Sequence, residues 1–107
     1  MYFKQGDIIN VNLSPTKGHE QSGYRPALVV SNNGFNRITN LAVICPITSK
    51  VKDFPSHIDL DNRTETVGQI LCQHVRTIDP VSRNATKKEE CPQDILLKVI
   101  DIVKSIY

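Results

Sequence analysis

The sequence has only three cysteines and no tryptophan. The number and spacing of the cysteines argue against two classes of small protein, those stabilised by disulfides and those stabilised by zinc. The three cysteines are odd in number and show no C-x-x-C spacing, so they predict neither a disulfide framework nor a zinc ribbon. Cys45 and Cys72 lie within apolar stretches, which favours small buried side chains over reactive thiols. Stability must therefore come from an ordinary apolar core.

Long hydrophobic runs and a strong net charge are also missing. No apolar run approaches the roughly 18 to 20 residues that span a bilayer, and residues 1–6 lack the apolar core of a signal peptide. We therefore expect a cytoplasmic protein that does not enter a membrane. The formal net charge is only +2, so attraction to nucleic acid must come from local groups of basic residues. The length of 107 residues predicts a single domain, residues 1–107, with no room for a separate cofactor domain.

The usual catalytic motifs are absent as well. The sequence contains no H-E-x-x-H motif, no P-loop, no G-x-S-x-G motif and no pair of carboxylates at an obvious shared site. We therefore expect no metal site and no cofactor. His57 and His74 lie on candidate strands, where a single histidine is more often a structural residue than a ligand.

The pattern of apolar residues predicts short strands followed by one helix. The expected strands are Asp7–Leu13, Ala27–Ser31, Leu41–Ile44 with an edge or bulge at Pro46, His57–Asp61, and one long bent strand from Val67 through Ile78. Phe35–Thr39 is expected to form a single short turn, and Pro92–Tyr107 has the period of an amphipathic helix. This order predicts an α+β fold that is mainly β with a C-terminal helix, built on a small, strongly bent antiparallel sheet or a partly open barrel.

The polar loop Ser14–Gly23 is the most informative stretch of the chain. It is long for so small a domain, and such loops are more often functional than merely connecting. It leads to Arg25, which precedes Pro26 with its fixed φ and is thereby placed to meet an anion. Thr48 lies where a predicted strand ends. The alternatives are that Arg25 only pairs with a carboxylate such as Glu20 and that Thr48 reflects ordinary strand propensity.

These residues suit a reaction whose nucleophile belongs to the substrate. RNA carries such a group in its 2′-hydroxyl, which attacks the adjacent phosphorus if the enzyme aligns it and stabilises the charge that develops on the phosphoryl oxygens. A guanidinium can donate two parallel hydrogen bonds to those oxygens, and a threonine hydroxyl can add a third. The other polar candidates in the sequence are His19, Glu20, Gln21, Gln73 and His74.

A series of short motifs follows in order over nearly the whole chain. They are Gly6-Asp7-Ile8, Pro15-Thr16-Lys17-Gly18-His19-Glu20-Gln21, Gly23-Tyr24-Arg25-Pro26, Phe35-Asn36, Pro46-Ile47-Thr48-Ser49 and Val75-Arg76-Thr77-Ile78-Asp79. Together they resemble the motifs of the MazF/PemK-type toxin endoribonucleases. The second, third and fifth motifs are the most specific in combination.

The resemblance implies a homodimer with an SH3-like barrel that cleaves single-stranded RNA at short sequences without a metal, and so inhibits translation and growth. It also implies a cognate antitoxin whose tail occupies the RNA groove. Arg25 and Thr48 would be the catalytic pair. The residues expected to contact RNA are Lys17, His19, Glu20, Gln21, Ser49, Gln73 and His74.

The chain departs from the family pattern just before the Val-Arg-Thr-Ile segment. Family members commonly have an acidic residue followed by glutamine there, whereas this chain has Gln73 and His74. The carboxylate base proposed for some relatives is therefore missing, and Arg25 is a poor base because arginine stays protonated. We hypothesise that His19 or His74 accepts the 2′-hydroxyl proton, and we assign His19 to the catalytic set. The alternative is that both imidazoles only bind bases or solvent.

Two other function classes fit parts of the sequence. A toxin of the same fold can act by binding a protein, as CcdB-like gyrase poisons do, and would need no arginine and threonine beside a groove. A plain SH3-like interaction module would show a more aromatic groove than three tyrosines and three phenylalanines supply. Cleavage of RNA in the presence of EDTA separates the first hypothesis from both.

Overall fold

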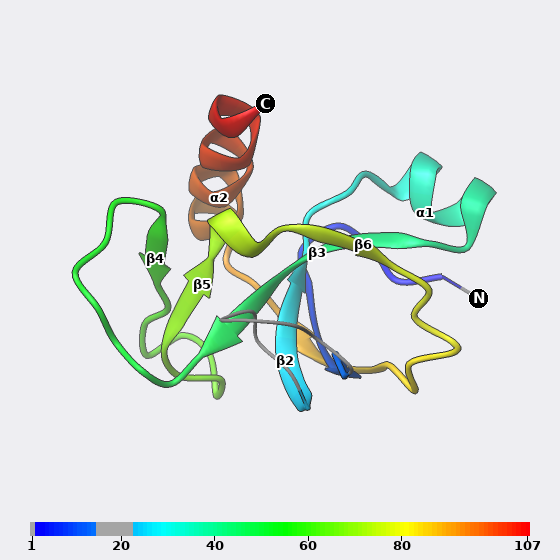
Figure 1. Ribbon diagram of the computed structural model, residues 1–107, viewed down its shortest axis with the longest axis horizontal. Coiled ribbons are helices and arrows are strands. Elements are labelled where there is room, and N and C mark those ends of the chain that lie inside the picture. Colours follow the sequence, from blue (N-terminus) through cyan, green and yellow to red (C-terminus); the bar gives the residue numbers. More distant parts are fainter. Residues whose placement is uncertain (1, 15–22) are drawn as a thin grey trace.

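The computed structural model describes residues 2–14 and 23–107, which build a strongly bent antiparallel sheet with a helix packed on one face (Figure 1). The elements in chain order are β1 (Asp7–Asn12), β2 (Tyr24–Val29), α1 (Asn33–Thr39), β3 (Ala42–Thr48), β4 (His57–Asp59), β5 (Gln69–Leu71), the 3-10 turn η1 (Cys72–His74), β6 (Arg76–Ile78), β7 (Thr86–Glu90) and α2 (Gln93–Ile106). The expected α+β class, mainly β with a C-terminal helix, is confirmed.

The sheet is bent around its central strand, β3. The strand order is β4-β5-β3-β2-β1-β7, and β6 also pairs with β3. One edge of β3 pairs with β2, whereas the other edge pairs with β6 over residues 42–44 and with β5 over residues 47–48. In the described part of the chain no ladder joins β4 to β7, so the expectation of a partly open barrel is confirmed.

Pro46 lies at the point where β3 changes neighbours. A proline has no backbone N–H and cannot complete a ladder on both edges of a strand. Residues 45 and 46 fall between the part of β3 that pairs with β6 and the part that pairs with β5, so one ladder is already interrupted there. This local break agrees with the expected edge or bulge at Pro46, although β3 as a whole is a central strand; Pro46 is fully buried, and β3 continues to Thr48.

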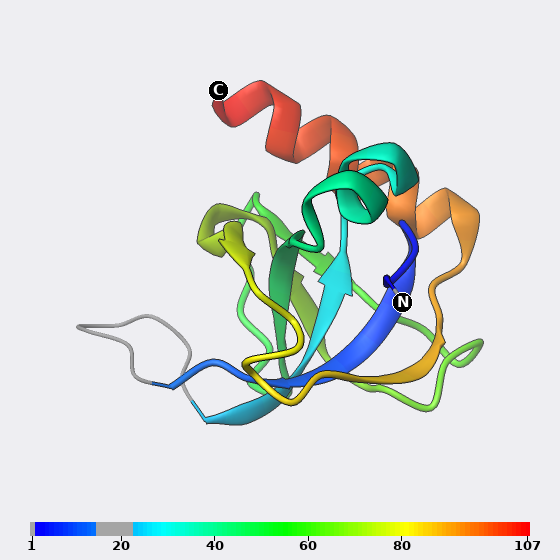
Figure 2. The ribbon, with the colours of Figure 1, turned by 90° about the vertical axis from the view of Figure 1, so that its right-hand side faces the viewer.

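Two apolar cores occupy the two faces of the sheet. Successive strand residues point to opposite faces, so Ile8 joins the core beneath α2 while Ile9 joins the other core. Ile8 shares its face of β1 with the polar Asn10 and Asn12, but α2 covers this end of the face and Ile8 is completely buried. The residues that α2 buries are Ile95, Leu96 and Val99, as its apolar period predicts. Both helices lie at the same end of the sheet (Figure 2).

Three further elements differ from the sequence predictions. The long strand expected from Val67 through Ile78 is divided by η1 into β5 and β6. These two strands pair with the same edge of β3, and η1 connects them across residues 45–46 of β3, which have no partner on that edge. Strand β7 was not predicted because its sequence, TKKEE, contains no apolar residue. It is an edge strand, where charged side chains discourage pairing with other chains. The short turn near Phe35 is a helix, α1, capped by the Asn32 side chain, which accepts a hydrogen bond from the Phe35 N–H at 2.8 Å.

All three cysteines are free and buried, which confirms the burial predicted for Cys45 and Cys72. The contact with Cys72, together with burial, raises the pKa of Cys45. Burial raises the pKa of Cys91 to about 11. These two thiols are therefore held in the protonated, unreactive form at neutral pH. No helix in the described residues is both long enough and apolar enough to cross a membrane.

The Glu89 side chain links the two ends of the open sheet. Its carboxylate projects from β7 and accepts hydrogen bonds from the backbone N–H of Glu65 at 3.0 Å, the backbone N–H of Thr66 at 2.8 Å and the Thr66 hydroxyl at 2.7 Å. These two residues belong to the segment that connects β4 to β5. The same segment is joined to α2 by Arg63, which donates to Asp94 at 2.9 Å. Side-chain hydrogen bonds thus link β7 to the β4–β5 segment, where no ladder joins the two ends of the sheet.

Glu89→Gln should lower the free energy of unfolding by about 1 kcal/mol, because a glutamine nitrogen cannot accept the bonds that the carboxylate accepts. Partial burial alone would raise the pKa of Glu89, but the bonds from Thr66 and Glu65 outweigh it and lower the pKa below its ordinary value of 4.5. This stabilisation is therefore complete above that value and is lost as the pH falls through the lower folded-state pKa. Urea denaturation of both proteins at several pH values measures it, and a constant difference between them down to acid pH would contradict the assignment.

Candidate active site

A polar cavity of about 380 Å³ opens at the end of β3. Its lining comes from the exit of β3, the loop that follows, β4, β5 and η1, and consists of Thr48, Lys50, Lys52, His57, Leu71, Gln73 and His74. A second hollow, about 490 Å³, lies beside α2 and is lined largely by apolar side chains. Only the first gathers hydroxyl, imidazole, amide and ammonium groups, so it is the candidate for chemistry.

Thr48 is held tightly at the edge of this cavity. Its side chain is buried, and its hydroxyl oxygen accepts the Lys50 backbone N–H at 3.2 Å. Thr48 pairs with Gln69 of β5. Gly68, the residue before Gln69, approaches Thr48 so closely that a Cβ added to Gly68 would lie 2.0 Å from the Thr48 carbonyl oxygen. Gly68 also has a φ of +119°. A glycine at this position is therefore what allows β5 to hold Thr48 in place.

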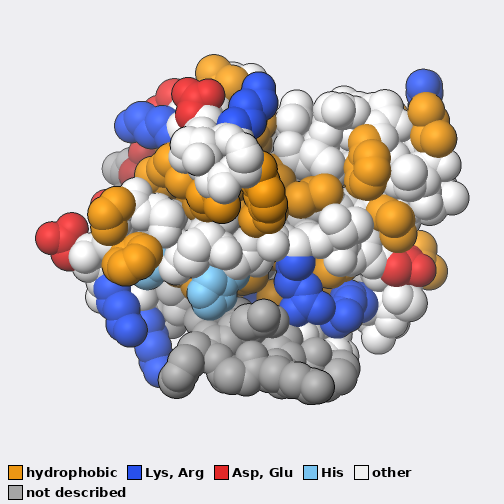
Figure 3. Space-filling view, turned by 45° about the horizontal axis from the view of Figure 1, so that its top comes forward, with side chains coloured by type: hydrophobic (Ala, Val, Ile, Leu, Met, Phe, Trp, Pro, Cys, Tyr) orange, Lys and Arg blue, Asp and Glu red, His pale blue; other side chains and the backbone are white. Residues whose placement is uncertain are grey.

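The charge of the cavity favours an anion. Lys50 and Lys52 are exposed beside it, and its lining contains no aspartate or glutamate from the described residues. In Figure 3, lysine and arginine side chains lie on both sides of a histidine on this face of the molecule. A phosphate group could therefore bind here without repulsion.

A network of amide and imidazole groups forms one wall of the cavity. The buried Gln69 contacts the His57 Nδ1 at 3.2 Å through its Oε1 and donates to the Asp59 carboxylate at 2.8 Å through its Nε2. Gln73 lies with its Nε2 2.8 Å from the His57 Nε2, and its Oε1 accepts the Ser56 hydroxyl at 2.6 Å. The network fixes the side chains of both His57 and Gln73.

His74 is the second histidine of the cavity. The residue is half-buried, and its Nδ1 is buried without a hydrogen-bond partner in the part of the chain that the structure describes. Buried polar atoms are usually paired, and one that is not invites a functional explanation. The sequence hypothesis that His74 contacts the substrate is consistent with its place in the lining.

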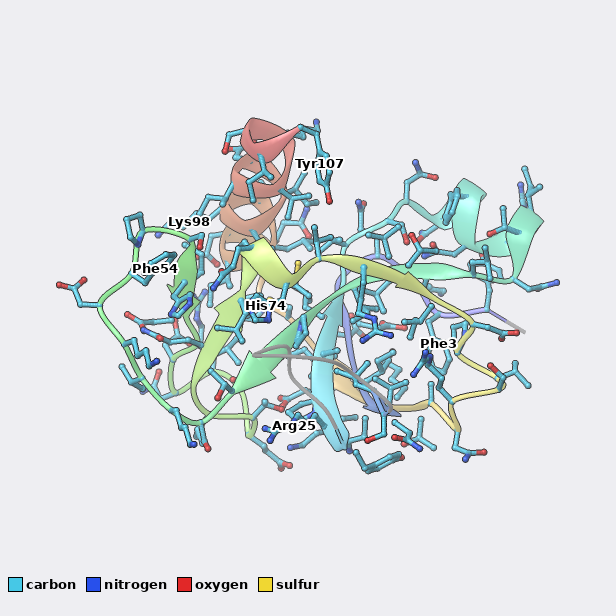
Figure 4. All side chains as sticks on the ribbon, in the orientation of Figure 1. Phe3, Arg25, Phe54, His74, Lys98 and Tyr107 are labelled. Atoms are coloured by element: carbon cyan, nitrogen blue, oxygen red, sulfur yellow. The ribbon has the colours of Figure 1, made fainter. Side chains whose placement is uncertain are left out.

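Arg25 lies on β2, the strand next to β3. The strand begins three residues earlier than the sequence predicts, so Arg25 is part of the ladder and pairs with Val11 of β1. On the other edge, Ala27 pairs with Pro46, and continuing this antiparallel register by two residues leads to Arg25 and Thr48. Arg25 is half-buried and is not among the lining residues of the cavity. Figure 4 shows it near the start of β2, with His74 on the opposite side of the β3 end in that view.

Of the other predicted site residues, one lies within the part of the chain that the structure describes and four lie outside it. Ser49 follows Thr48 and is exposed. Lys17, His19, Glu20 and Gln21 lie outside the described residues. Among the flanking described residues, the Leu13 N–H donates to the Gly23 carbonyl at 2.8 Å and the Gly23 N–H donates to the Ser14 hydroxyl at 2.8 Å. Ser14 and Gly23 are thus held together, and Gly23 lies two residues before Arg25 in the sequence.

Sequence reasoning missed four lining residues. His57 was interpreted as a structural histidine, and Lys50, Lys52 and Leu71 were not among the candidate site residues. The signal that could have found the histidine and the two lysines is a short run after the Thr48 motif in which Lys50 and Lys52 are followed by Phe54 and His57. Basic side chains beside aromatic rings are typical of surfaces that bind single-stranded nucleic acid.

Comparison with known proteins identifies the family. Residues 4–107 match the family described as the PemK-like, MazF-like toxin of type II toxin-antitoxin systems. The chain belongs to this family. The MazF/PemK resemblance carried by the motifs is therefore confirmed over almost the whole chain.

Individual relatives support the same assignment. The chain is 36% identical over 108 residues to the endoribonuclease PemK of Escherichia coli, covering 97% of this chain and 81% of PemK. It is 40% identical over 83 residues to the endoribonuclease toxin MazF of Escherichia coli K12, covering 78% of this chain and 74% of MazF. These relatives confirm the prediction of an endoribonuclease.

Solved structures confirm the fold. The crystal structure of MazF from Deinococcus radiodurans superposes with a TM-score of 0.93 at 36% identity, covering 99% of this chain and 96% of that one. A MazE–MazF complex from the same organism superposes with a TM-score of 0.86, also at 36% identity, and covers the same shares. The expected bent sheet with a C-terminal helix is thus the MazF fold.

Proposed function

We propose that this MazF/PemK-type endoribonuclease toxin cleaves single-stranded RNA at specific short sequences, without a metal ion, and thereby inhibits translation and growth. The observation that carries the proposal is the pairing of a buried threonine hydroxyl with a basic cavity at the end of β3, next to the strand that carries Arg25. This arrangement can bind a phosphate and offers hydrogen-bond donors to its oxygens. The attacking group in the proposal is the 2′-hydroxyl of the RNA itself.

In the proposed reaction, the 2′-hydroxyl of one ribose loses its proton to a base and its oxygen attacks the adjacent phosphorus. The bond from phosphorus to the 5′-oxygen of the next nucleotide breaks, and that oxygen takes up a proton. The products are a 2′,3′-cyclic phosphate and a 5′-hydroxyl end. Arg25 and Thr48 donate hydrogen bonds to the phosphoryl oxygens as negative charge develops on them.

A histidine is the proposed base, because glutamine replaces the acidic residue at position 73. His74 lines the cavity, and His19 belongs to the polar loop motif that precedes Arg25 in the sequence. We place both in contact with the RNA and retain His19 in the catalytic set. The remaining proposed RNA contacts are Lys17, Glu20, Gln21, Ser49 and Gln73, to which the structure adds Lys50, Lys52 and His57 as candidates.

The partners follow from the family and from the apolar hollow beside α2. Relatives from Deinococcus radiodurans have been solved as MazE–MazF complexes, and we propose a cognate antitoxin that covers the RNA groove of this chain. The hollow beside α2 is lined by Val30, Phe35, Val43, Ile100 and Val103 together with polar residues at its rim. We propose that a second copy of the chain covers this face, and that the toxin acts in the cytoplasm, where its RNA substrate is found.

Cleavage of a long mixed-sequence RNA in excess EDTA tests the proposal. We expect discrete fragments whose 5′ ends share a short sequence, with the same pattern and rate as in buffer containing magnesium. A preparation of Thr48→Val, which keeps the shape of the side chain but not its hydroxyl, controls for contaminating nucleases and should be slower by roughly tenfold or more. An uncut RNA would instead favour a toxin that acts by binding a protein.

A further inference from the structure

Five side chains at the cavity form a continuous chain of hydrogen bonds. In order they are Asp59, Gln69, His57, Gln73 and Ser56, with separations of 2.8, 3.2, 2.8 and 2.6 Å. The chain runs from a carboxylate, which can only accept, to a hydroxyl, which can both donate and accept. Its direction is therefore set at the Asp59 end.

Gln69 is the member whose orientation is determined by its partners. Its Oε1 accepts the backbone N–H of Lys52 at 3.0 Å, and a backbone N–H is always a donor. Its Nε2 donates to the Asp59 carboxylate. Because each amide atom has a partner of known character, the oxygen of Gln69 must face His57.

The orientation of Gln69 determines the proton position on His57. The Nδ1 of His57 faces an oxygen, so it carries the proton and donates. In the neutral imidazole the Nε2 is then an acceptor, and it requires a donor opposite. The Phe54 ring packs 5.0 Å from the His57 ring, centroid to centroid, and supports it from one side.

His57 in turn orients the amide of Gln73. The Gln73 nitrogen must face the His57 Nε2, which leaves its oxygen to accept the Ser56 hydroxyl. One N–H and one oxygen lone pair of this amide remain unused. Gln73 is exposed and lines the cavity that contains Thr48, so this donor and acceptor are presented to whatever binds there in one fixed order.

A fixed donor–acceptor order distinguishes two kinds of base. Adenine and cytosine present an amino donor beside a ring-nitrogen acceptor, whereas guanine and uracil present a carbonyl acceptor beside a ring N–H donor. An amide that can rotate by half a turn can bind both kinds of base at the same position. An amide held in one orientation accepts only one.

We propose that Gln73 recognises the edge of one RNA base, and that His57 is the positioning residue that makes this recognition selective between amino bases (A, C) and keto bases (G, U). The inference rests on the proposed function, since it names the specificity device of the same site. Ser56 holds the far side of the amide but does not set its direction, because a hydroxyl serves either amide atom. His57 alone forces the choice.

The test is to map cleavage of a randomised single-stranded RNA pool at about pH 8, where an imidazole is neutral. Wild type should cut sites in which one position is occupied by only amino bases or only keto bases. His57→Phe keeps a flat ring against Phe54 but removes the acceptor, and it should lower this amino-to-keto preference by about tenfold or more. Gln73→Met removes the amide without leaving a cavity and should lose the same preference.

Ser56→Ala is the matched control. It removes one hydrogen bond from the Gln73 amide, but the Nε2 of His57 still accepts only from the amide nitrogen. The amino-to-keto preference should therefore remain within about twofold of wild type. A merely structural role for His57 would change the total rate and leave the preference intact. Retention of the preference in His57→Phe, or its equal loss in Ser56→Ala, overturns the inference. Cleavage by wild type with no amino-to-keto preference at any position overturns it alone, whereas an uncut pool overturns the proposed function with it.

Discussion

Arg25→Ala should slow single-turnover cleavage by roughly 100- to 1000-fold, the loss expected when one preorganised donor to a developing oxyanion is removed. Arg25 lies on β2, where the register leads toward Thr48, and a guanidinium can reach two phosphoryl oxygens at once. The effect should fall on the rate at saturating RNA, because this contact strengthens as charge develops in the transition state. Quenched-flow assays with a labelled oligonucleotide measure it.

Arg25→Lys is the control for charge. Lysine keeps the positive charge but donates as a point charge rather than through a planar pair of N–H groups. We expect a rate between those of wild type and Arg25→Ala, and thermal unfolding of both variants checks that each is folded under the assay conditions. An alanine variant that cuts at more than about a third of the wild-type rate would place Arg25 outside the reaction and remove the proposed charge stabilisation.

Gly68→Ala should both destabilise the protein and inactivate it. The new Cβ would lie 2.0 Å from the Thr48 carbonyl oxygen, and the φ of +119° is one that side-chain-bearing residues rarely adopt. Relief of the overlap requires β5 to move away from β3. We expect a loss of about 3 kcal/mol or more in the free energy of unfolding, and a melting temperature lower by more than about 10 °C.

Gly23→Ala separates the overlap from backbone strain. Gly23 also has a positive φ, +83°, but an added Cβ there would meet nothing within 4 Å. Its variant should therefore lose only about 1 kcal/mol. Equal melting temperatures for the two alanine variants would show that the close approach of Gly68 to Thr48 is not what positions the threonine.

The sequence predicted the elements whose apolar pattern is strong. Helix α2 buries one set of residues at the helical period, Ile9 and Val11 of β1 fall in one core at the strand period, and the end of β3 at Thr48 follows from the Pro-x-Thr-Ser motif. It failed for β7, which is entirely polar, because an edge strand is recognised by what it pairs with and not by its own composition. It also failed at η1, where the break in the strand depends on the interrupted ladder of β3.

The candidate site was predicted in part for the same reason. Thr48 lies in one of the sequence motifs, Gln73 and His74 directly precede another, and all three residues line one cavity. The role of His57 depends on Gln69 and Gln73, which lie 12 and 16 residues away in the sequence and meet it only because β4 pairs with β5. No local pattern encodes such a contact. The positions of Lys17, His19, Glu20 and Gln21 stay predictions.

The central claim is that the RNA supplies its own nucleophile to a cavity formed by Thr48 and its basic neighbours. The most direct measurement uses a short RNA oligonucleotide containing a mapped cleavage site, with a single 2′-deoxyribose on the 5′ side of the cut. The account predicts that this oligonucleotide binds about as tightly as the all-ribose one and is not cut at that position. Cleavage at the deoxyribose would mean that water attacks the phosphorus and would contradict the account.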